Sequence, residues 1–180
     1  MASLAFAENL VVRFDRGVRT SEEVERRLAG ALREAGYVKP TYEQAILDRE
    51  LAYPTALEMG AFSVAIPHCD PSHVERGAIC VGVLSAPVPW RRMDAPDLAT
   101  PVSLVVMLAL NEAHEHLEML GRVIELVQDQ ELVARIVAAD SPDEAFGLLA
   151  PRLSGAPLRA AARAPCFYTR SVCLLTFHIE

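Results

Sequence analysis

The stretch VSLVVMLAL, residues 102–110, marks a change of pattern in the chain. It is a nearly continuous apolar run, which is typical of a strand that is covered on both faces. From Ala113 onward the apolar residues recur at helical spacing instead, with Leu120, Ile124 and Val127 on one stripe. A doubly buried strand followed by an amphipathic helix predicts a sheet with helices packed against it.

The residues before this stretch alternate between helix and strand signals. Thr20 and Glu23 form a capping-box pattern, and Gly36 supplies a stop, so we expect a helix between them. A second helix is predicted at 41–51, where Thr41 and Gln44 repeat the N-terminal capping pattern. It should end before Pro54 because the residue before a proline avoids the helical region. Strands are predicted at LVVRF (10–14), FSVAIP (62–67), GAICVGVLSA (77–86) and VPW (88–90).

Two shorter helices are predicted at 130–138 and 142–149, the second with Ser141 as its N-cap. This order of elements favours the α/β class. We therefore predict a mixed, mostly parallel central β-sheet that is flanked by helices on both faces.

Composition limits the functions open to the chain. The 180 residues carry a net charge of -7, which argues against nucleic acid as a partner because phosphate binding needs clustered basic side chains. The four cysteines have no C-x-x-C spacing, the start lacks a basic segment before its apolar residues, and no apolar run reaches the length of a membrane span. We expect a reduced, cytoplasmic protein.

The chain changes character near residue 150. Residues 151–180 contain four arginines and one acidic residue, Glu180, whereas the preceding part is acidic. We expect one domain over residues 1–150 and a C-terminal extension of unknown role over 151–180, which is either a tail or an edge strand or oligomer contact.

The stretch AIPHCDPSH, residues 65–73, contains the candidate chemistry. His68 follows a predicted strand on a proline turn, and in open α/β sheets sites form beyond the strand ends. Three alternatives remain open from the residues alone. His68 is a loop histidine; or His68, Cys69, Asp70 and His73 bind zinc, although consecutive residues converge poorly on one ion; or Cys69 is a nucleophile, which would need a neighbouring base.

A wider set of motifs resembles a known family. Arg49-Glu50, Pro54-Thr55, AIPH at 65–68 and His116-Leu117, in this order, resemble the IIA component of the bacterial phosphoenolpyruvate:sugar phosphotransferase system, fructose/mannitol superfamily, over residues 5–150. The stretches AIPHCDPSH and TPVSLVVMLAL look most like its galactitol-type branch.

The resemblance implies a phosphoryl relay. His68 would accept a phosphoryl group from the carrier protein HPr and pass it to a IIB partner, which serves a membrane IIC component that recognises the sugar or polyol. Neutral imidazole is a competent nucleophile near pH 7, so this chemistry needs no metal or other cofactor. Arg49 matches the arginine of the family pattern, and a guanidinium can hold two phosphoryl oxygens.

Other residues take secondary places in this interpretation. The resemblance implies that His116 orients the phosphorylated histidine; His114 lies two positions away and points about 200° around a helix, so it cannot share that place. His73 is a further candidate, Glu50 is expected to be structural, Thr55 either bonds a phosphoryl oxygen or caps its turn, and His178 has no assigned role.

Two other functions compete with the carrier. One is a regulatory IIA-like protein that signals its phosphorylation state by binding other proteins. The other is a metal-dependent or thiol enzyme that uses His68, Cys69 and His73. The sugar and the oligomeric state are not determined by the sequence.

Overall fold

The computed structural model describes residues 4–111 and 113–153, without the side chains of residues 113–118. Within these residues, five strands form one mixed sheet in the order β1-β4-β5-β3-β2. The strands are β1 (Val11–Phe14), β2 (Ala56–Leu57), β3 (Ser63–Ala65), β4 (Ala78–Arg91) and β5 (Ala99–Ala109). The β1-β4 and β3-β5 pairs are parallel, and the β4-β5 and β2-β3 pairs are antiparallel.

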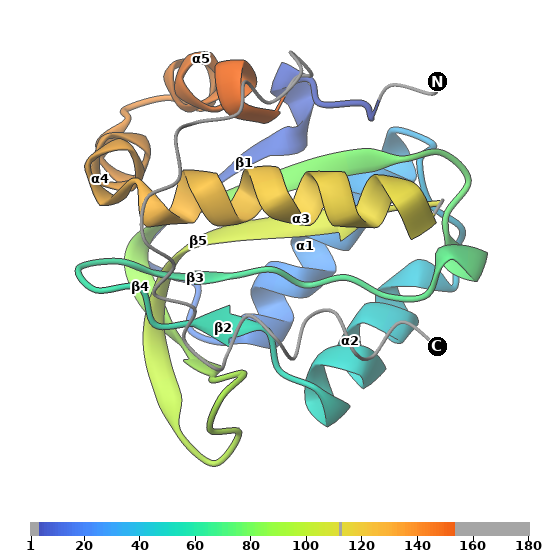
Figure 1. The fold of residues 1–180 in the computed structure, drawn as a ribbon, viewed down its shortest axis with the longest axis horizontal. Coiled ribbons are helices and arrows are strands. Elements are labelled where there is room, and N and C mark those ends of the chain that lie inside the picture. The colour runs from blue at the N-terminus through green and yellow to red at the C-terminus, as the bar shows by residue number, and fades with distance from the viewer. Residues whose placement is uncertain (1–3, 112, 154–180) are drawn as a thin grey trace.

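Helices cover both faces of this sheet, which confirms the predicted mixed α/β fold. One face packs against α1 (Ser21–Glu34) and α2 (Tyr42–Ala52), and the other against α3 (Ala113–Gln128), α4 (Gln130–Ala138) and α5 (Pro142–Leu153). Short 3-10 turns, η1 (Glu8–Leu10) and η2 (Pro71–His73), precede β1 and β4. In Figure 1, α3 crosses in front of β5 and α1 lies behind it.

The position of strand β5 between two helical layers explains the apolar run of residues 102–110. Leu104, Val106 and Leu108 belong to the core under α3 to α5, whereas Val105 and Met107 belong to the core under α1 and α2. All of these residues are 1% exposed or less. Because successive side chains of a strand point to opposite faces, a strand covered twice must be apolar at nearly every position.

Two strand predictions need correction. The predicted strands 77–86 and 88–90 are one strand, β4, whose pairing with β5 shifts register between Val83 and Val88. This irregularity lets the chain pass through the Ser85 to Pro87 segment without ending the strand. The short strand β2 was not predicted, because two residues are too few to show a period.

Local signals at the helix ends are mostly confirmed. Thr20 and Glu23 form the predicted capping box at α1, and Gly36 takes a positive φ of 75° just after that helix. Ser141 accepts a hydrogen bond from the backbone of Glu144, as expected of an N-cap. Thr41 is different: its side chain does not cap α2 and bonds His73 instead.

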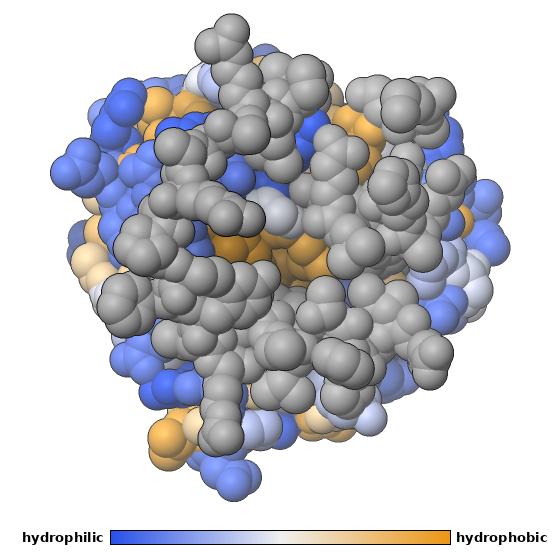
Figure 2. Space-filling model, in the orientation of Figure 1, coloured by the Kyte–Doolittle hydropathy of each residue, from blue (hydrophilic) through white to orange (hydrophobic). Residues whose placement is uncertain are grey.

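The periphery of the face seen in Figure 2 is largely hydrophilic, with hydrophobic side chains visible between the polar ones. None of the helices in the described ranges is long and apolar enough to cross a membrane. Helix α5 continues to Leu153, four residues past the predicted end. The predicted extension, including His178, lies almost entirely outside the described residues.

Candidate functional site

His68 lies where the chain leaves strand β3. The segment after β3 continues alongside β5, since the backbone N–H of Leu108 donates to the carbonyl of Pro67 over 2.9 Å and His68 forms a parallel bridge with Leu108. The His68 side chain is half-buried. Strand pairing up to His68 therefore places its imidazole at the end of the sheet, as the sequence predicts.

A hydrogen bond from the chain itself sets the tautomer of His68. Its Nδ1 lies 2.9 Å from the carbonyl oxygen of Ile66. A carbonyl oxygen only accepts, so Nδ1 carries the hydrogen in this bond. In the neutral ring the lone pair is then on Nε2.

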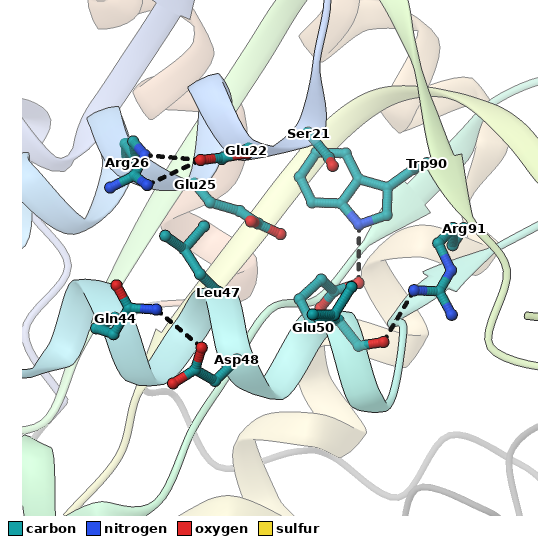
Figure 3. A pocket seen from close by; sticks show the side chains of 11 residues that line it. Ser21, Glu22, Glu25, Arg26, Gln44, Leu47, Asp48, Glu50, Trp90 and Arg91 are labelled. Carbon is teal, nitrogen blue, oxygen red and sulfur yellow. Dashed lines mark hydrogen bonds and ion pairs between the residues drawn. The ribbon is translucent and has the colours of Figure 1, made fainter.

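The backbone N–H of Ile66 is in turn held by a buried polar group, the Glu50 cluster, which consists of Glu50, Thr55 and Trp90. The Glu50 carboxylate accepts from the Thr55 backbone N–H at 2.6 Å, from the Thr55 hydroxyl at 2.8 Å and from the Trp90 indole N–H at 2.8 Å. Figure 3 shows the bond between Trp90 and Glu50. These three donors join the end of α2 to the next turn and to β4.

Thr55 connects this cluster to the histidine. Its hydroxyl donates to Glu50 and accepts from the backbone N–H of Ile66 over 3.2 Å, so it fixes the residue whose carbonyl holds His68. Thr55 is 2% exposed and its one hydrogen is already used. Of the two roles expected for Thr55, the structure favours the turn and not a bond to a phosphoryl oxygen.

Burial controls the charge of Glu50. Desolvation raises the pKa of its carboxyl above the usual value, while the hydrogen bonds from Trp90 and Thr55 and the charge of Arg49 lower it again. A carboxylate with three donors satisfies nearly all of its acceptor sites. Glu50 is therefore a structural residue, as expected from the sequence.

Arg49 lines an open groove of about 590 Å³ that we call the α2 groove, and the next residue, Glu50, points about 100° further around α2. The groove runs between α2 and the loop after His68, and Cys69, Asp70 and His73 form its other wall. The Arg49 guanidinium stacks on the Tyr53 ring, 4.6 Å from its centre, and Nη1 donates to the Tyr53 carbonyl over 3.4 Å. The structure thus brings Arg49 to the loop that contains His68.

His73 has a different environment from His68. Its Nδ1 lies 2.9 Å from the hydroxyl of Thr41, and its carbonyl accepts from the backbone of Lys39. The Lys39 ammonium donates to the carbonyl of Ser72 at 2.7 Å. These contacts tie η2 to the start of α2, which is a structural task for His73.

Cys69 has the opposite properties to those of a reactive thiol. The Cys69 side chain is 6% exposed. Its burial, and secondly the charge of Asp70, raise the pKa of the thiol to about 12, while the charge of Arg49 acts to lower this pKa. Nucleophilic cysteines need a lowered pKa. Among the described residues, no three His, Cys, Asp or Glu side chains are grouped so that they could hold a metal ion.

The second histidine of the motif, His116, lies in the first turns of α3, and so does His114. The side chains of both lie outside the described residues. The role expected of His116 therefore stays a prediction.

Sequence reasoning missed two parts of the site, the Ile66 carbonyl and the Trp90 indole. A backbone carbonyl leaves no signal in the residue letters. Trp90 is the single tryptophan of the chain and lies in a predicted strand after apolar residues, so its sequence context predicts an ordinary core residue. Only its pairing with Glu50, forty positions earlier, reveals it as a hydrogen-bond donor.

Comparison with known families agrees with this geometry. Residues 5–151 match the family described as the phosphoenolpyruvate-dependent sugar phosphotransferase system, EIIA 2. The chain belongs to this EIIA family. The resemblance drawn from Arg49-Glu50, AIPH and the later histidine is thereby confirmed at the level of the family.

Relatives within the family come from several sugar systems. The chain is 32% identical over 157 residues to the 2-O-alpha-mannosyl-D-glycerate-specific EIIABC component of Escherichia coli K12, covering 84% of this chain and 23% of that protein. It is 27% identical over 129 residues to the galactitol-specific EIIA component of the same strain, covering 72% of this chain and 85% of that one. The chain thus spans less than a quarter of the length of the first relative. The galactitol-type branch stays a prediction.

A solved structure shares the EIIA fold. The complex of enzyme IIA of the mannitol system with phosphorylated enzyme IIB, from Escherichia coli, matches with a TM-score of 0.67 and 25% identity, covering 82% of this chain and 99% of the matched one.

Proposed function

We propose that this EIIA protein carries a phosphoryl group on Nε2 of His68, between phospho-HPr and a IIB component. One observation supports the choice of atom above all others: the Ile66 carbonyl holds Nδ1 at 2.9 Å and so directs the lone pair to Nε2. The carrier domain comprises residues 1–150, in accord with the family match over 5–151.

The transfer is an exchange between two imidazoles. Nε2 of His68 attacks the phosphorus of the donor phosphohistidine, a new N–P bond forms, and the donor N–P bond breaks with its electron pair left on the donor ring. His68 keeps its hydrogen on Nδ1 and becomes positively charged as the new bond forms. The Ile66 carbonyl dipole is already aimed at this hydrogen, so it stabilises the charge without rearrangement.

Arg49 neutralises the transferred group. Phosphoryl transfer depends on positioning and on compensating charge at the equatorial oxygens. The guanidinium lies in the α2 groove beside Cys69, the residue after His68, and its long 3.4 Å bond to the Tyr53 carbonyl is a weak restraint. A swing from the Tyr53 ring toward the phosphoryl oxygens exchanges this contact for charge-assisted hydrogen bonds. His116 orients the His68 ring from the start of α3.

The partners follow from the family. A IIA protein of the mannitol system has been solved with phosphorylated IIB, and this chain has the same fold. The protein acts in the cytoplasm, with HPr as donor, IIB as acceptor and a membrane IIC component served indirectly. The step belongs to sugar or polyol uptake.

The experiment is phosphorylation of the purified chain with phosphoenolpyruvate, enzyme I and HPr, followed by mapping of the acid-labile phosphate. We expect one phosphoryl group, on His68, and none in H68A. H73A is the matched control, because it removes a histidine of the same loop and should keep full labelling. Full labelling of H68A would overturn the assignment, and a chase with IIB separates a transport carrier, which loses the label, from a regulator, which keeps it.

A further inference from the structure

A second cavity, which we call the Glu25 pocket, lies between α1, α2 and β4, and Arg49 is not among the residues that line it. Its volume is about 280 Å³. Figure 3 shows the side chains that line it, with Glu25 extending from α1 into the space in front of Glu50 and Trp90. The phosphoryl-transfer site described above makes no use of Glu25.

Glu25 is the unusual residue of this pocket. It is 3% exposed, yet its Oε1 has no hydrogen-bond partner. Leaving a buried carboxyl oxygen unpaired is costly, and such groups are rare in folded proteins. The oxygen therefore calls for a donor from outside the chain.

The cations of the pocket do not meet this need, because they are bonded elsewhere. Arg26 donates to Glu22 and to Glu43, over 2.8 and 2.6 Å, at the outer edge between the two helices. Arg91 donates to the carbonyls of Leu51 and Pro96. With Glu25 ionised, the four acidic residues that line the pocket, Glu22, Glu25, Asp48 and Glu50, outnumber its two arginines.

The walls of the pocket suit an organic cation better than a metal ion. Leu47 and Leu51 contribute apolar surface beside the carboxyl groups, and the Trp90 indole, which is 1% exposed, also lines the pocket. A carboxylate attracts an ammonium group, and the apolar walls can hold its carbon chain. Among the described residues no three side chains are placed to hold a metal ion.

We propose that the Glu25 pocket binds a primary ammonium group on a short alkyl stem, with Oε1 of Glu25 as the acceptor. This ligand goes beyond the proposed carrier function and takes no part in the transfer. The ammonium belongs either to a free alkylamine or to a lysine side chain of a partner. Glu50, which faces the same pocket, is joined through Thr55 and Ile66 to His68.

The acidity of Glu25 supports the proposal and makes it sensitive to pH. Burial first, then the charges of Glu50 and Glu22, raise the pKa of Glu25 to about 8, while Arg26 lowers it. The charged groups that face the pocket are Glu22, Glu25 and Arg26 from α1, Asp48 and Glu50 from α2, and Arg91 from β4. A cation favours ionised Glu25, so binding strengthens as pH rises toward the pKa.

The test uses the full chain and butylammonium chloride at pH 8.5, at constant ionic strength. Binding is followed by Trp90 fluorescence and by the NMR signal of its indole N–H, which are specific because the chain has one tryptophan. We expect saturation with butylammonium and no response to 1-butanol or to added sodium chloride. Affinity should fall about tenfold or more at pH 6.5, where Glu25 is protonated and the amine is still charged.

Variants locate the site. E25Q should weaken binding about tenfold or more, whereas E34Q, which removes the same charge from the exposed end of α1, should leave it unchanged. If E25Q fails to fold, the pH series on the unaltered chain decides. No saturation, an equal response to butanol, or E25Q with unchanged affinity would overturn the proposal.

A second ligand separates the two sources of the ammonium. Nα-acetyl-lysine N-methylamide presents the same group with flanking peptide bonds. Tighter binding of this compound assigns the pocket to a lysine of a partner, and tighter binding of butylammonium assigns it to a free amine. If neither compound binds, the proposal is contradicted.

Discussion

Replacing Thr55 by valine removes one hydroxyl that takes part in two buried hydrogen bonds. The hydroxyl donates to the Glu50 carboxylate over 2.8 Å and accepts from the Ile66 backbone N–H over 3.2 Å. Valine keeps the size and branching of threonine, so the change tests the hydrogen bonds and hardly alters packing. It leaves one oxygen of Glu50 and one buried N–H without this partner.

The magnitude follows from these two bonds. A hydrogen bond to a charged group contributes about 1.5–3 kcal/mol to stability and a neutral one about 0.5–1.5 kcal/mol. The bonds share an atom and are not additive, so we expect T55V to lower the free energy of unfolding by about 2–4 kcal/mol. T55S is the matched control, because it keeps the hydroxyl and loses one buried methyl group, at about 1 kcal/mol.

Urea unfolding followed by Trp90 fluorescence measures both variants, since the chain has one tryptophan and its indole donates to Glu50. The rate of phosphorylation by phospho-HPr measures the effect on His68. We expect this rate to fall in T55V under conditions where the variant is folded, because Ile66 loses the contact that positions its carbonyl. A T55V protein no less stable than T55S, or one with an unchanged rate, would refute the proposed link from Glu50 to His68.

Two further predictions concern charge. R49K should slow phosphorylation of His68 about tenfold or more without changing unfolding by more than about 0.5 kcal/mol, because lysine keeps the charge but not the two-pronged geometry; equal rates would remove Arg49 from the transfer. The raised pKa of Glu25, about 8, means that the folded state binds more protons than the unfolded state between about pH 4.5 and 8, so the free energy of unfolding should fall across that window. The fall is at most about 5 kcal/mol, and urea titrations should show it flattened in E25Q but not in E34Q.

Much of the fold was predictable because its signals are local or periodic. The capping box at Thr20, the stop at Gly36 and the twice-covered strand β5 each depend on neighbouring residues or on burial of both faces. The union of two predicted strands into β4 was not predictable, since the register shift near Val88 depends on its pairing with β5. Strand β2 was not predictable for the same reason, because its two residues are a strand only through their pairing with β3.

The site divides in a similar way. The motifs were enough to select His68 and Arg49 as candidate site residues and to assign Glu50 a structural role, because the chemical type of a side chain is given directly by the sequence. The role of Thr41 could not be predicted correctly. Its position before α2 predicts a helix cap, but the Thr41 hydroxyl forms a hydrogen bond with His73, thirty-two residues away. Whether Thr55 caps a turn or contacts a phosphoryl group was open until its partners were known.

The sequence by itself determined the family, the class of the fold and the histidine proposed to carry the phosphoryl group, because these depend on ordered motifs and on the burial pattern of each element. The tertiary structure decided which nitrogen of that histidine carries its hydrogen, because the Ile66 carbonyl accepts from Nδ1. It also joined Glu50 to Trp90 and left Glu25 buried beside them without a partner for its Oε1. Such contacts unite residues far apart in the chain, and their energies depend on burial and distance, which only the folded structure sets.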